Sequence, residues 1–408
     1  MAKKTINKEL TGAQDLYNFL FEACNIIRGP VSQDNFKDYI TPLLYYKRIS
    51  DVYDEETEEA LISSGGDKEY ASLPEQHRFV IPDGCHWQEV RERTENLGAA
   101  IVGAMRQIEI ANPDTLYGVL SMFSSQKWTN KAILNDSKIR DLIEHLSKRK
   151  LGNKDYPADL MGDAYEILLK KFADDSKAQA GEFYTPRSVV RLLVHILDPQ
   201  PGETVYDPAC GSGGMLIEAI RYMHDDSLCC GSIFGQEKNV VNAAIAKMNL
   251  FLHGASDFNV MQGDTLRDPK ILQGGNIAKF DCVIANPPFS LENWGATEWS
   301  SDKYKRNIYG TPSDSCGDYA WIQHMICSMS SGKGRMAVVM PQGILFRGNQ
   351  EAEIRKQLVE SDLIEAVVTL GDKLFYGTGL SPCFLIIRRM KQAHHSGRIL
   401  MIDGSKIL

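Results

Sequence analysis

The spacing of hydrophobic and polar residues changes about 170 residues into the chain. In the first part, apolar residues recur every three or four positions, as in residues 16–27 and 36–49, which is typical of amphipathic helices. From about residue 180 onward, short β-rich runs alternate with helical patterns, which indicates βαβ units and a mostly parallel sheet. We therefore predict a helical N-terminal domain over residues 1–165, followed by an α/β domain over residues 166–408.

The α/β part can be divided into its expected elements. We expect strands at residues 203–206, 233–236, 280–285, 336–340, 364–369, 384–388 and 399–402, with helices at 214–223 and 240–253. A further strand is expected to end at Asp264. In such folds, ligands bind at the carboxyl ends of the strands, so the residues that follow each strand are the first candidates for a site.

Composition and charge narrow the possibilities. No apolar run approaches the roughly 18 residues that span a bilayer, and the N-terminus has no signal-peptide core, so we expect a cytoplasmic protein without a membrane segment. The nine cysteines are odd in number and scattered, which argues against a disulfide framework. The net charge of −8 means that work on DNA would need a local basic patch or a partner. The acidic run at 51–59 is interpreted as a solvated helix face or loop.

A glycine-rich turn follows the first expected strand of the α/β part, in the sequence Thr-Val-Tyr-Asp-Pro-Ala-Cys-Gly-Ser-Gly-Gly-Met-Leu at 204–216. Glycines at 211, 213 and 214 let the backbone approach a ligand and adopt positive φ, while the helix that follows exposes free N–H groups. The turn lacks the Gly-Lys-Ser/Thr of a phosphate-binding loop and does not continue as Gly-x-Gly-x-x-Gly. By itself it indicates a cofactor site only weakly.

Two acidic residues downstream make a nucleoside the better interpretation. Glu237 ends the second expected strand, thirty residues after Asp207, where a carboxylate can accept both hydroxyls of a ribose. Asp264 ends the third strand and could accept a hydrogen bond from an adenine amino group. Each alone could be an ordinary strand-end acid, but in this order they outline an adenosine pocket.

The sequence Asn286-Pro287-Pro288-Phe289 follows a buried strand and carries the expected chemistry. An exocyclic adenine amine is a poor nucleophile because its lone pair is delocalised into the ring. The Asn286 side-chain oxygen and the Pro287 carbonyl, which the prolines hold rigid, could each accept one amino hydrogen and aim the lone pair at a methyl sulfonium. Phe289 offers a face on which a base swung out of the duplex can stack. A plain Asn-Pro turn is the alternative, which the ordered set of upstream residues disfavours.

At this point the sequence resembles the modification (methyltransferase) subunit of type I restriction-modification systems, a family of N6-adenine DNA methyltransferases. The resemblance adds Gly-Glu-Phe-Tyr-Thr-Pro-Arg at 181–187, and it also covers the segments 340–346 and 377–382 around the target-base pocket. It implies S-adenosylmethionine as cofactor and a Rossmann-like methyltransferase domain. The implied cofactor-binding residues are Glu182, Phe183, Tyr184, Thr185, Pro186, Arg187, Asp207, Ala209, Gly211, Ser212, Gly213, Gly214, Glu237 and Asp264, with Asn286, Pro287, Pro288 and Phe289 as catalytic residues.

The resemblance also implies partners. Two modification subunits pair with one specificity subunit that reads double-stranded DNA, from which an adenine is flipped out, and a nuclease subunit can join. This division of labour fits the acidic net charge. Family members continue with a helical tail, whereas this sequence stops soon after the expected strand at 399–402, so a C-terminal helical tail is expected to be missing.

Several other functions remain open from the motif alone. A protein glutamine N5-methyltransferase uses a similar loop but usually has tyrosine as the aromatic residue, and a cytosine-N4 DNA methyltransferase is chemically closer still. A catalytically degenerate subunit kept as a DNA clamp is disfavoured because Asn286, Glu237 and Asp264 are all present. Methyl transfer needs no metal and we predict no metal site. We expect none of the nine histidines to be catalytic.

Overall fold

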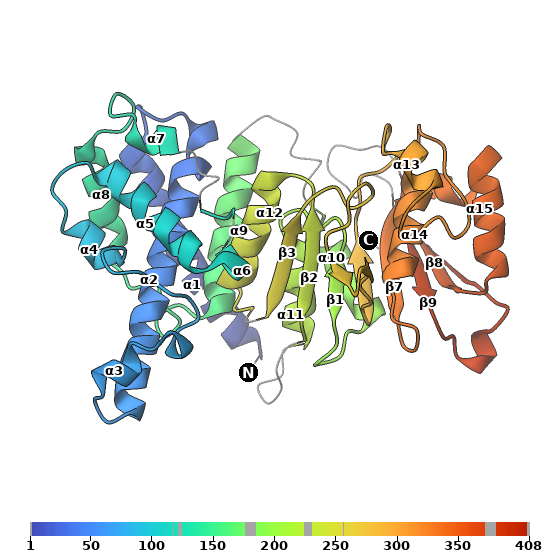
Figure 1. Ribbon diagram of the computed structural model, residues 1–408, viewed down its shortest axis with the longest axis horizontal. Helices are drawn as coiled ribbons and strands as arrows, with labels where there is room; N and C mark the ends of the chain where they lie inside the picture. The colour runs from blue at the N-terminus through green and yellow to red at the C-terminus, as the bar shows by residue number, and fades with distance from the viewer. Residues whose placement is uncertain are drawn as a thin grey trace. The chain divides into compact units, whose positions relative to one another are not determined.

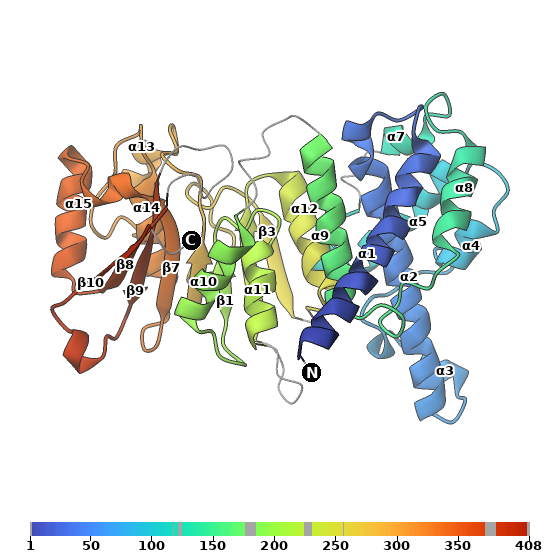
Figure 2. The same cartoon turned by 180° about the vertical axis from the view of Figure 1, so that it is seen from behind.

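A computed structural model describes residues 2–116, 118–120, 125–175, 185–223, 231–255, 257–371 and 381–405. The chain separates into two compact units (Figures 1 and 2). One is Met1–Ala178 with Lys247–Gly254, and the other is Gln179–Ala246 with Ala255–Leu408. Among the described residues, no helix combines the length and the apolar character that crossing a membrane would need.

The described residues of the first unit form helices joined by loops. Its elements are α1 (Ala2–Ile27), η1 (Gln33–Asn35), α2 (Lys37–Ser63), α3 (Lys68–Ala71), η2 (Pro74–Gln76), α4 (Trp87–Arg91), α5 (Leu97–Ala111), α6 (Pro113–Leu116), α7 (Ser125–Thr129), α8 (Asp136–Leu146) and α9 (Ala158–Asp175). The predicted periodicity is confirmed in α1, whose residues Leu16, Leu20, Ala23 and Ile27 are all fully buried. Helix α1 lies against α8 and α9.

The acidic run of α2 differs from the solvated face that its composition predicted. Asp51 is buried and accepts a hydrogen bond from the Leu151 N–H at 2.6 Å. Glu55 is buried as well and accepts from the N–H groups of Asn153 and Lys154, at 2.6 and 3.1 Å. These carboxylates replace the water that the loop's N–H groups would otherwise bind, because buried polar groups need partners. The run is therefore partly structural.

The second unit is built on a mostly parallel sheet. Its elements are α10 (Arg187–Leu197), β1 (Val205–Asp207), α11 (Gly214–Met223), β2 (Ile233–Glu237), α12 (Val240–Leu252), β3 (Phe258–Gln262), β4 (Leu272–Gln273), β5 (Asn276–Ile277), β6 (Cys282–Ala285), α13 (Ala296–Ser300), α14 (Asp318–Ser328), β7 (Arg335–Pro341), η3 (Gln342–Leu345), α15 (Asn349–Glu360), β8 (Ile364–Leu370), β9 (Pro382–Arg388), η4 (Ala393–His395) and β10 (Leu400–Gly404). The last residues of α12 fall in the helical unit.

The eight-stranded sheet has the order β10-β8-β9-β7-β6-β1-β2-β3, and only β9 runs antiparallel to its neighbours. Strands β6 and β7 are buried along their whole length, as expected for central strands of a parallel sheet. Helices α10 and α11 lie in front of the sheet in Figure 2. The predicted α/β class with a mostly parallel sheet is confirmed.

The strand order places a topological switch point beside β1. From β1, the chain proceeds outward through β2 to β3, and then returns to form β6 on the other side of β1. The loops that follow β1 and β6 leave the carboxyl edge of the sheet on either side of this switch point, which is where ligands of open α/β sheets bind.

Candidate active site

The glycine turn after β1 has the predicted positive φ at two of its three glycines, while Gly214 is already helical. Gly211 has φ +53° and Gly213 has φ +85°, in the left-handed region that favours glycine. The Gly213 N–H donates to the Cys210 carbonyl at 2.7 Å, and α11 begins at Gly214. A Cβ atom added at Gly211 would meet nothing within 4 Å. The positive φ therefore favours glycine at position 211, and the space beside this residue is open.

Asp207 lies at the base of this turn and is 2% exposed. Its Oδ1 accepts the Ala209 N–H at 2.9 Å, which tightens the turn. Burial, with a smaller contribution from the Glu237 carboxylate, raises the pKa of Asp207 to about 8. A carboxyl group with so large a shift at the carboxyl edge of a parallel sheet is typical of a functional site.

Glu237, at the end of β2, joins two loops of the site. Its Oε2 accepts the Gly211 N–H at 2.9 Å and its Oε1 accepts the Asn239 N–H at 2.7 Å. A carboxylate offers about four lone-pair positions, so the predicted ribose-binding role is compatible with both bonds. Glu237 thereby holds the glycine turn against the end of β2.

Asp264 follows β3, as predicted, and lies at the same edge. Its Oδ1 accepts the Arg267 N–H at 3.2 Å, and its Oδ2 pairs with Lys238 at 2.9 Å. The buried Gln236 side chain donates to the Asp268 carbonyl at 3.0 Å and accepts the Lys270 N–H at 2.9 Å. The loop that carries Asp264 is therefore held by β2 as well as by its own strand.

Asn286 follows β6 directly, and only one of its two side-chain amide atoms is hydrogen-bonded among the described residues. Its Nδ2 donates to the Thr185 hydroxyl at 2.9 Å, across 101 residues of sequence. Its Oδ1 is buried and has no hydrogen-bond partner among the described residues. A buried acceptor without a partner costs stability, so an orphaned amide oxygen is typical of a site that awaits a ligand donor.

The other predicted site residues lie around this asparagine. Pro287 is buried, Pro288 is exposed and Phe289 is half-buried. Thr185, which the resemblance assigned to the cofactor, accepts the hydrogen bond from Asn286, while Pro186 and Arg187 start α10. Ala209 and Ser212 lie within the glycine turn. Glu182, Phe183 and Tyr184, together with most of the segment 377–382, fall outside the described residues.

A buried network behind the site has no counterpart in the sequence prediction. Arg306 is 1% exposed and donates to the carbonyls of Thr265 and Leu266, at 2.9 and 2.7 Å. It also pairs with Asp302 at 2.7 Å and contacts His324 Nδ1 at 3.2 Å. Arg306 therefore supports the loop that carries Asp264. Nothing in the sequence pattern distinguishes it from an exposed loop arginine.

His324 is part of that network and has a structural role. Its Nε2 lies 3.2 Å from the Tyr206 hydroxyl, and burial followed by the neighbouring Arg306 charge holds its pKa well below the usual range. A buried neutral imidazole between a tyrosine and an arginine is a connecting group of the core. The described part of the chain holds no cluster of histidine, cysteine or acidic side chains suited to a metal ion.

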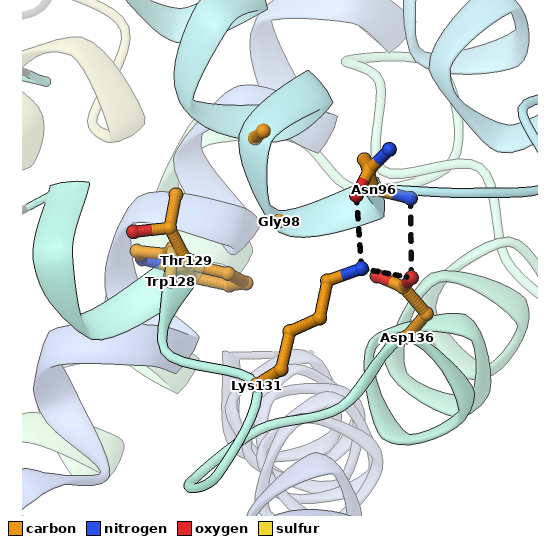
Figure 3. Close-up of a pocket in the computed structure, with 7 residues that line it drawn as sticks. Asn96, Gly98, Trp128, Thr129, Lys131 and Asp136 are labelled. Carbon is orange, nitrogen blue, oxygen red and sulfur yellow. Dashed lines mark hydrogen bonds and ion pairs between the residues drawn. The ribbon is translucent and has the colours of Figure 1, made fainter.

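The helical unit contains a small pocket between α5, α7 and α8. It encloses about 90 Å³ and is lined by Asn96, Gly98, Ala99, Trp128, Thr129, Lys131 and Asp136 (Figure 3). Its charged groups already satisfy one another, since Lys131 donates to Asn96 at 2.9 Å and to Asp136 at 3.2 Å. Asp136 also accepts the N–H groups at the start of α5. This pocket therefore offers no free charge for catalysis.

Comparison with known proteins covers both units. The family described as N-6 DNA Methylase matches residues 156–408, and the one described as HsdM N-terminal domain matches residues 16–146. The methylase subunit of the type I restriction enzyme MjaVII from Methanocaldococcus jannaschii is 34% identical over 89% of this chain and 63% of its own length. The MjaVIII methylase subunit from the same organism is 33% identical over 97% of this chain and 69% of its own length.

The solved structures include a close match in fold. The type I restriction-modification methyltransferase subunit from Streptococcus thermophilus superposes with a TM-score of 0.77 at 26% identity, covering 97% of this chain and 88% of that one. The chain thus spans less than two thirds of the MjaVII relative, but most of the length of the solved one. The predicted resemblance is confirmed, and the chain belongs to the N-6 DNA methylase family and, within it, to the methylase subunits of type I restriction enzymes.

Proposed function

We propose that this protein transfers a methyl group from S-adenosylmethionine to the N6 amino group of adenine in double-stranded DNA. It would act as the modification subunit of a type I restriction-modification complex, in the cytoplasm. Membership of the N-6 DNA methylase family supports the reaction class, and the names of the relatives support the kind of complex. The observation that carries the proposal is the buried Oδ1 of Asn286 at the carboxyl edge of the sheet, which has no hydrogen-bond partner among the described residues.

The Asn286 amide matches what an exocyclic amine requires. Its Nδ2 is committed to Thr185, which leaves Oδ1 as an acceptor for one amino hydrogen of the target base. The Pro287 carbonyl, fixed between two prolines, is proposed to accept the other. Two fixed acceptors would localise the lone pair on the nitrogen and orient it, which is electrostatic and positional catalysis without a covalent intermediate. Phe289 would stack on the flipped base.

The residues at the ends of β1, β2 and β3 fit the expected cofactor. The space beside Gly211 is open, and Glu237 holds the turn in place. A ligand could therefore approach the protein backbone closely at this glycine. We propose that Asp207 and the glycine turn hold the methionine part, Glu237 the ribose and Asp264 the adenine. When bound, S-adenosylmethionine supplies an electrophilic methyl group on a positively charged sulfur. Asp264 already pairs with Lys238, so it would bind the adenine either by releasing this lysine or by accepting from both groups.

Partners follow from the same proposal. We propose that a specificity subunit, bound to two copies of the modification subunit, reads the DNA sequence, and that a nuclease subunit can join. The net charge of −8 supports this arrangement, because an acidic chain gains little from phosphate contacts on its own.

The test is an Asn286→Ala substitution in the complex with the specificity subunit from the neighbouring gene. We expect methyl transfer to DNA to fall by at least about 100-fold, as on loss of a transition-state acceptor, while cofactor affinity measured by calorimetry stays nearly unchanged. Asn18→Ala, on the exposed side of α1, is the matched control and should leave both quantities unchanged.

Nucleoside analysis of the methylated DNA distinguishes the remaining reactions. N6-methyladenine supports the proposal, whereas N4-methylcytosine would identify a cytosine-N4 DNA methyltransferase. Methylation of a release-factor peptide in place of DNA would identify a protein glutamine N5-methyltransferase. A complex that binds cofactor but methylates neither substrate would favour a clamp role. Full activity of the Asn286→Ala variant would show that another residue performs the chemistry.

A further inference from the structure

The residue that follows the catalytic loop has an unfavourable backbone conformation. Ser290 comes directly after Phe289 and has φ +50°, in the left-handed region. For a residue with a Cβ atom this conformation is disfavoured, so the surrounding structure must hold it. The loop 286–289 therefore ends at a point that the rest of the fold has to fix.

Asp318 and Arg347 provide that support. Asp318 is fully buried at the start of α14, and its Oδ1 accepts the Ser290 N–H at 2.7 Å. Arg347 donates from Nη1 to Asp318 Oδ2 at 2.7 Å and from Nη2 to the Ser290 hydroxyl at 3.2 Å. The three residues form a closed triangle of hydrogen bonds, which we call the Ser290 clamp. A guanidinium can do this because its donors are held in a rigid fork.

The clamp is itself firmly held. Arg347 lies 3.4 Å from the buried Glu351, a second carboxylate that fixes the guanidinium. The Tyr319 hydroxyl of α14 donates to the Ile344 carbonyl of η3 at 2.7 Å, which joins the two segments that carry Asp318 and Arg347. Beyond Ser290, the Gly317 N–H donates to the Leu291 carbonyl at 3.0 Å.

The Ser290 clamp lies at the end of the catalytic loop, where it can affect catalysis more than general stability. The catalytic loop is fixed at its start by β6 and by the bond from Asn286 to Thr185, and at its end by the clamp. Arg347 comes shortly after β7, which is the parallel neighbour of β6, so both loops leave the same edge of the sheet. By contrast, the buried pair of Arg335 with Glu203, at 2.6 Å, lies where β7 and β1 begin, at the edge of the sheet away from the catalytic loop. It is an arginine–carboxylate pair of the ordinary structural kind.

We infer that Asp318 and Arg347 are positioning residues for methyl transfer, which hold the catalytic loop in register with the target base through Ser290. This inference rests on the proposed function. The clamp would not touch the base or the cofactor. Its contribution would be to keep the acceptors of Asn286 and Pro287, and the Phe289 ring, in the geometry that the reaction needs.

Loss of the clamp should therefore affect the rate of the chemical step more than cofactor binding. Misplacement of a reacting group by about 1 Å can reduce a rate by roughly 100-fold. We expect Arg347→Met to reduce the single-turnover methylation rate by about 10- to 100-fold. The dissociation constant for S-adenosylmethionine should stay close to that of the wild type. Arg347→Lys, which retains the charge but not the fork, should recover part of the rate.

The experiment uses the complete complex with its specificity subunit and two DNA duplexes. One has adenine at the target position and serves for the methylation rate; the other has 2-aminopurine there, which lacks the 6-amino group and reports base flipping by its fluorescence. Single-turnover rate, cofactor affinity, melting temperature and 2-aminopurine fluorescence are measured for each variant. Arg335→Met is the matched control, which we expect to lower the melting temperature without changing the rate of the folded enzyme. Arg347→Met should also alter the fluorescence of the flipped base, which a purely structural change would not do.

Two sets of results would overturn the inference while leaving the proposed function intact. One is a wild-type rate in Arg347→Met. The other is an equal loss of rate in Arg335→Met and Arg347→Met at the same folded fraction. If Arg347→Met does not fold, Ser290→Ala removes only the hydroxyl contact and should still slow the reaction several-fold; an unchanged rate would count against the clamp. A wild-type complex that methylates no DNA would instead refute the proposed function.

Discussion

The Asp207 carboxyl group is buried and has a pKa near 8, so its proton links stability to pH. The unfolded chain would release this proton near pH 4, its ordinary value, and the folded chain only near pH 8. The stability that this proton contributes is therefore fully present below about pH 4 and is lost as the pH rises toward 8, at about 1.4 kcal/mol per pH unit.

Asp207→Asn should remove this pH dependence, since the amide oxygen can still accept the Ala209 N–H. Between pH 6 and pH 8, we expect the cofactor-free wild type to lose on the order of 2 kcal/mol more unfolding free energy than the variant, measured by denaturant titration. Asp141→Asn, on an exposed position of α8, should retain the wild-type slope. Parallel slopes for wild type and Asp207→Asn would mean that Asp207 is already ionised in the folded protein.

Single residues of the site could be predicted where the chemistry is local. Asn286 and its prolines are adjacent in sequence, Glu237 ends β2 and Asp264 follows β3, so residue type and position identified them as candidates. The contact of Asn286 with Thr185 spans 101 residues, and no local pattern could predict it. The assignments of cofactor and base contacts to individual residues remain predictions.

At the scale of elements, the β1–turn–α11 unit can be tested through its glycines. Gly211→Ala should cost about 1–2 kcal/mol for the left-handed conformation, and its methyl group would also project into the space proposed for the cofactor. We expect cofactor affinity, measured by calorimetry, to fall by at least tenfold.

Gly202 provides the matched control for this prediction. It has φ +83° and, like Gly211, a Cβ atom there would meet nothing within 4 Å, but it precedes β1 at the other edge of the sheet. Gly202→Ala should lower stability by a similar amount and leave cofactor affinity unchanged. Equal affinities for both variants would place the cofactor away from the glycine turn.

The elements also show where pattern-based prediction stops. Alternating strands and helices predicted the sheet well, because burial on both faces gives parallel strands a distinctive apolar composition. The acidic run of α2 was interpreted as solvated because composition does not reveal that Asp51 and Glu55 face a distant loop. The Ser290 clamp escaped prediction for the same reason, as its three residues come from three separate segments.

For the whole molecule, the most informative property is the net charge of −8 in a chain proposed to act on DNA. Proteins that bind DNA unaided gain most of their non-specific affinity from basic residues that displace counterions. The family resemblance and the charge lead to the same expectation, because a subunit that delegates recognition can remain acidic. The information on which DNA sequence is methylated would then lie in the specificity subunit.

This expectation can be tested by titrating a DNA duplex with the isolated chain and with the chain bound to its specificity subunit. At physiological salt, we expect the isolated chain to bind no more tightly than non-specific proteins do, at roughly 10⁻⁴ to 10⁻⁶ M, whereas the complex should bind at least about 1,000-fold more tightly to its target. Fluorescence anisotropy over a salt series would measure both affinities and their slopes. Nanomolar binding by the isolated chain would mean that a basic surface of this subunit dominates its negative net charge, and that recognition is shared between the subunits.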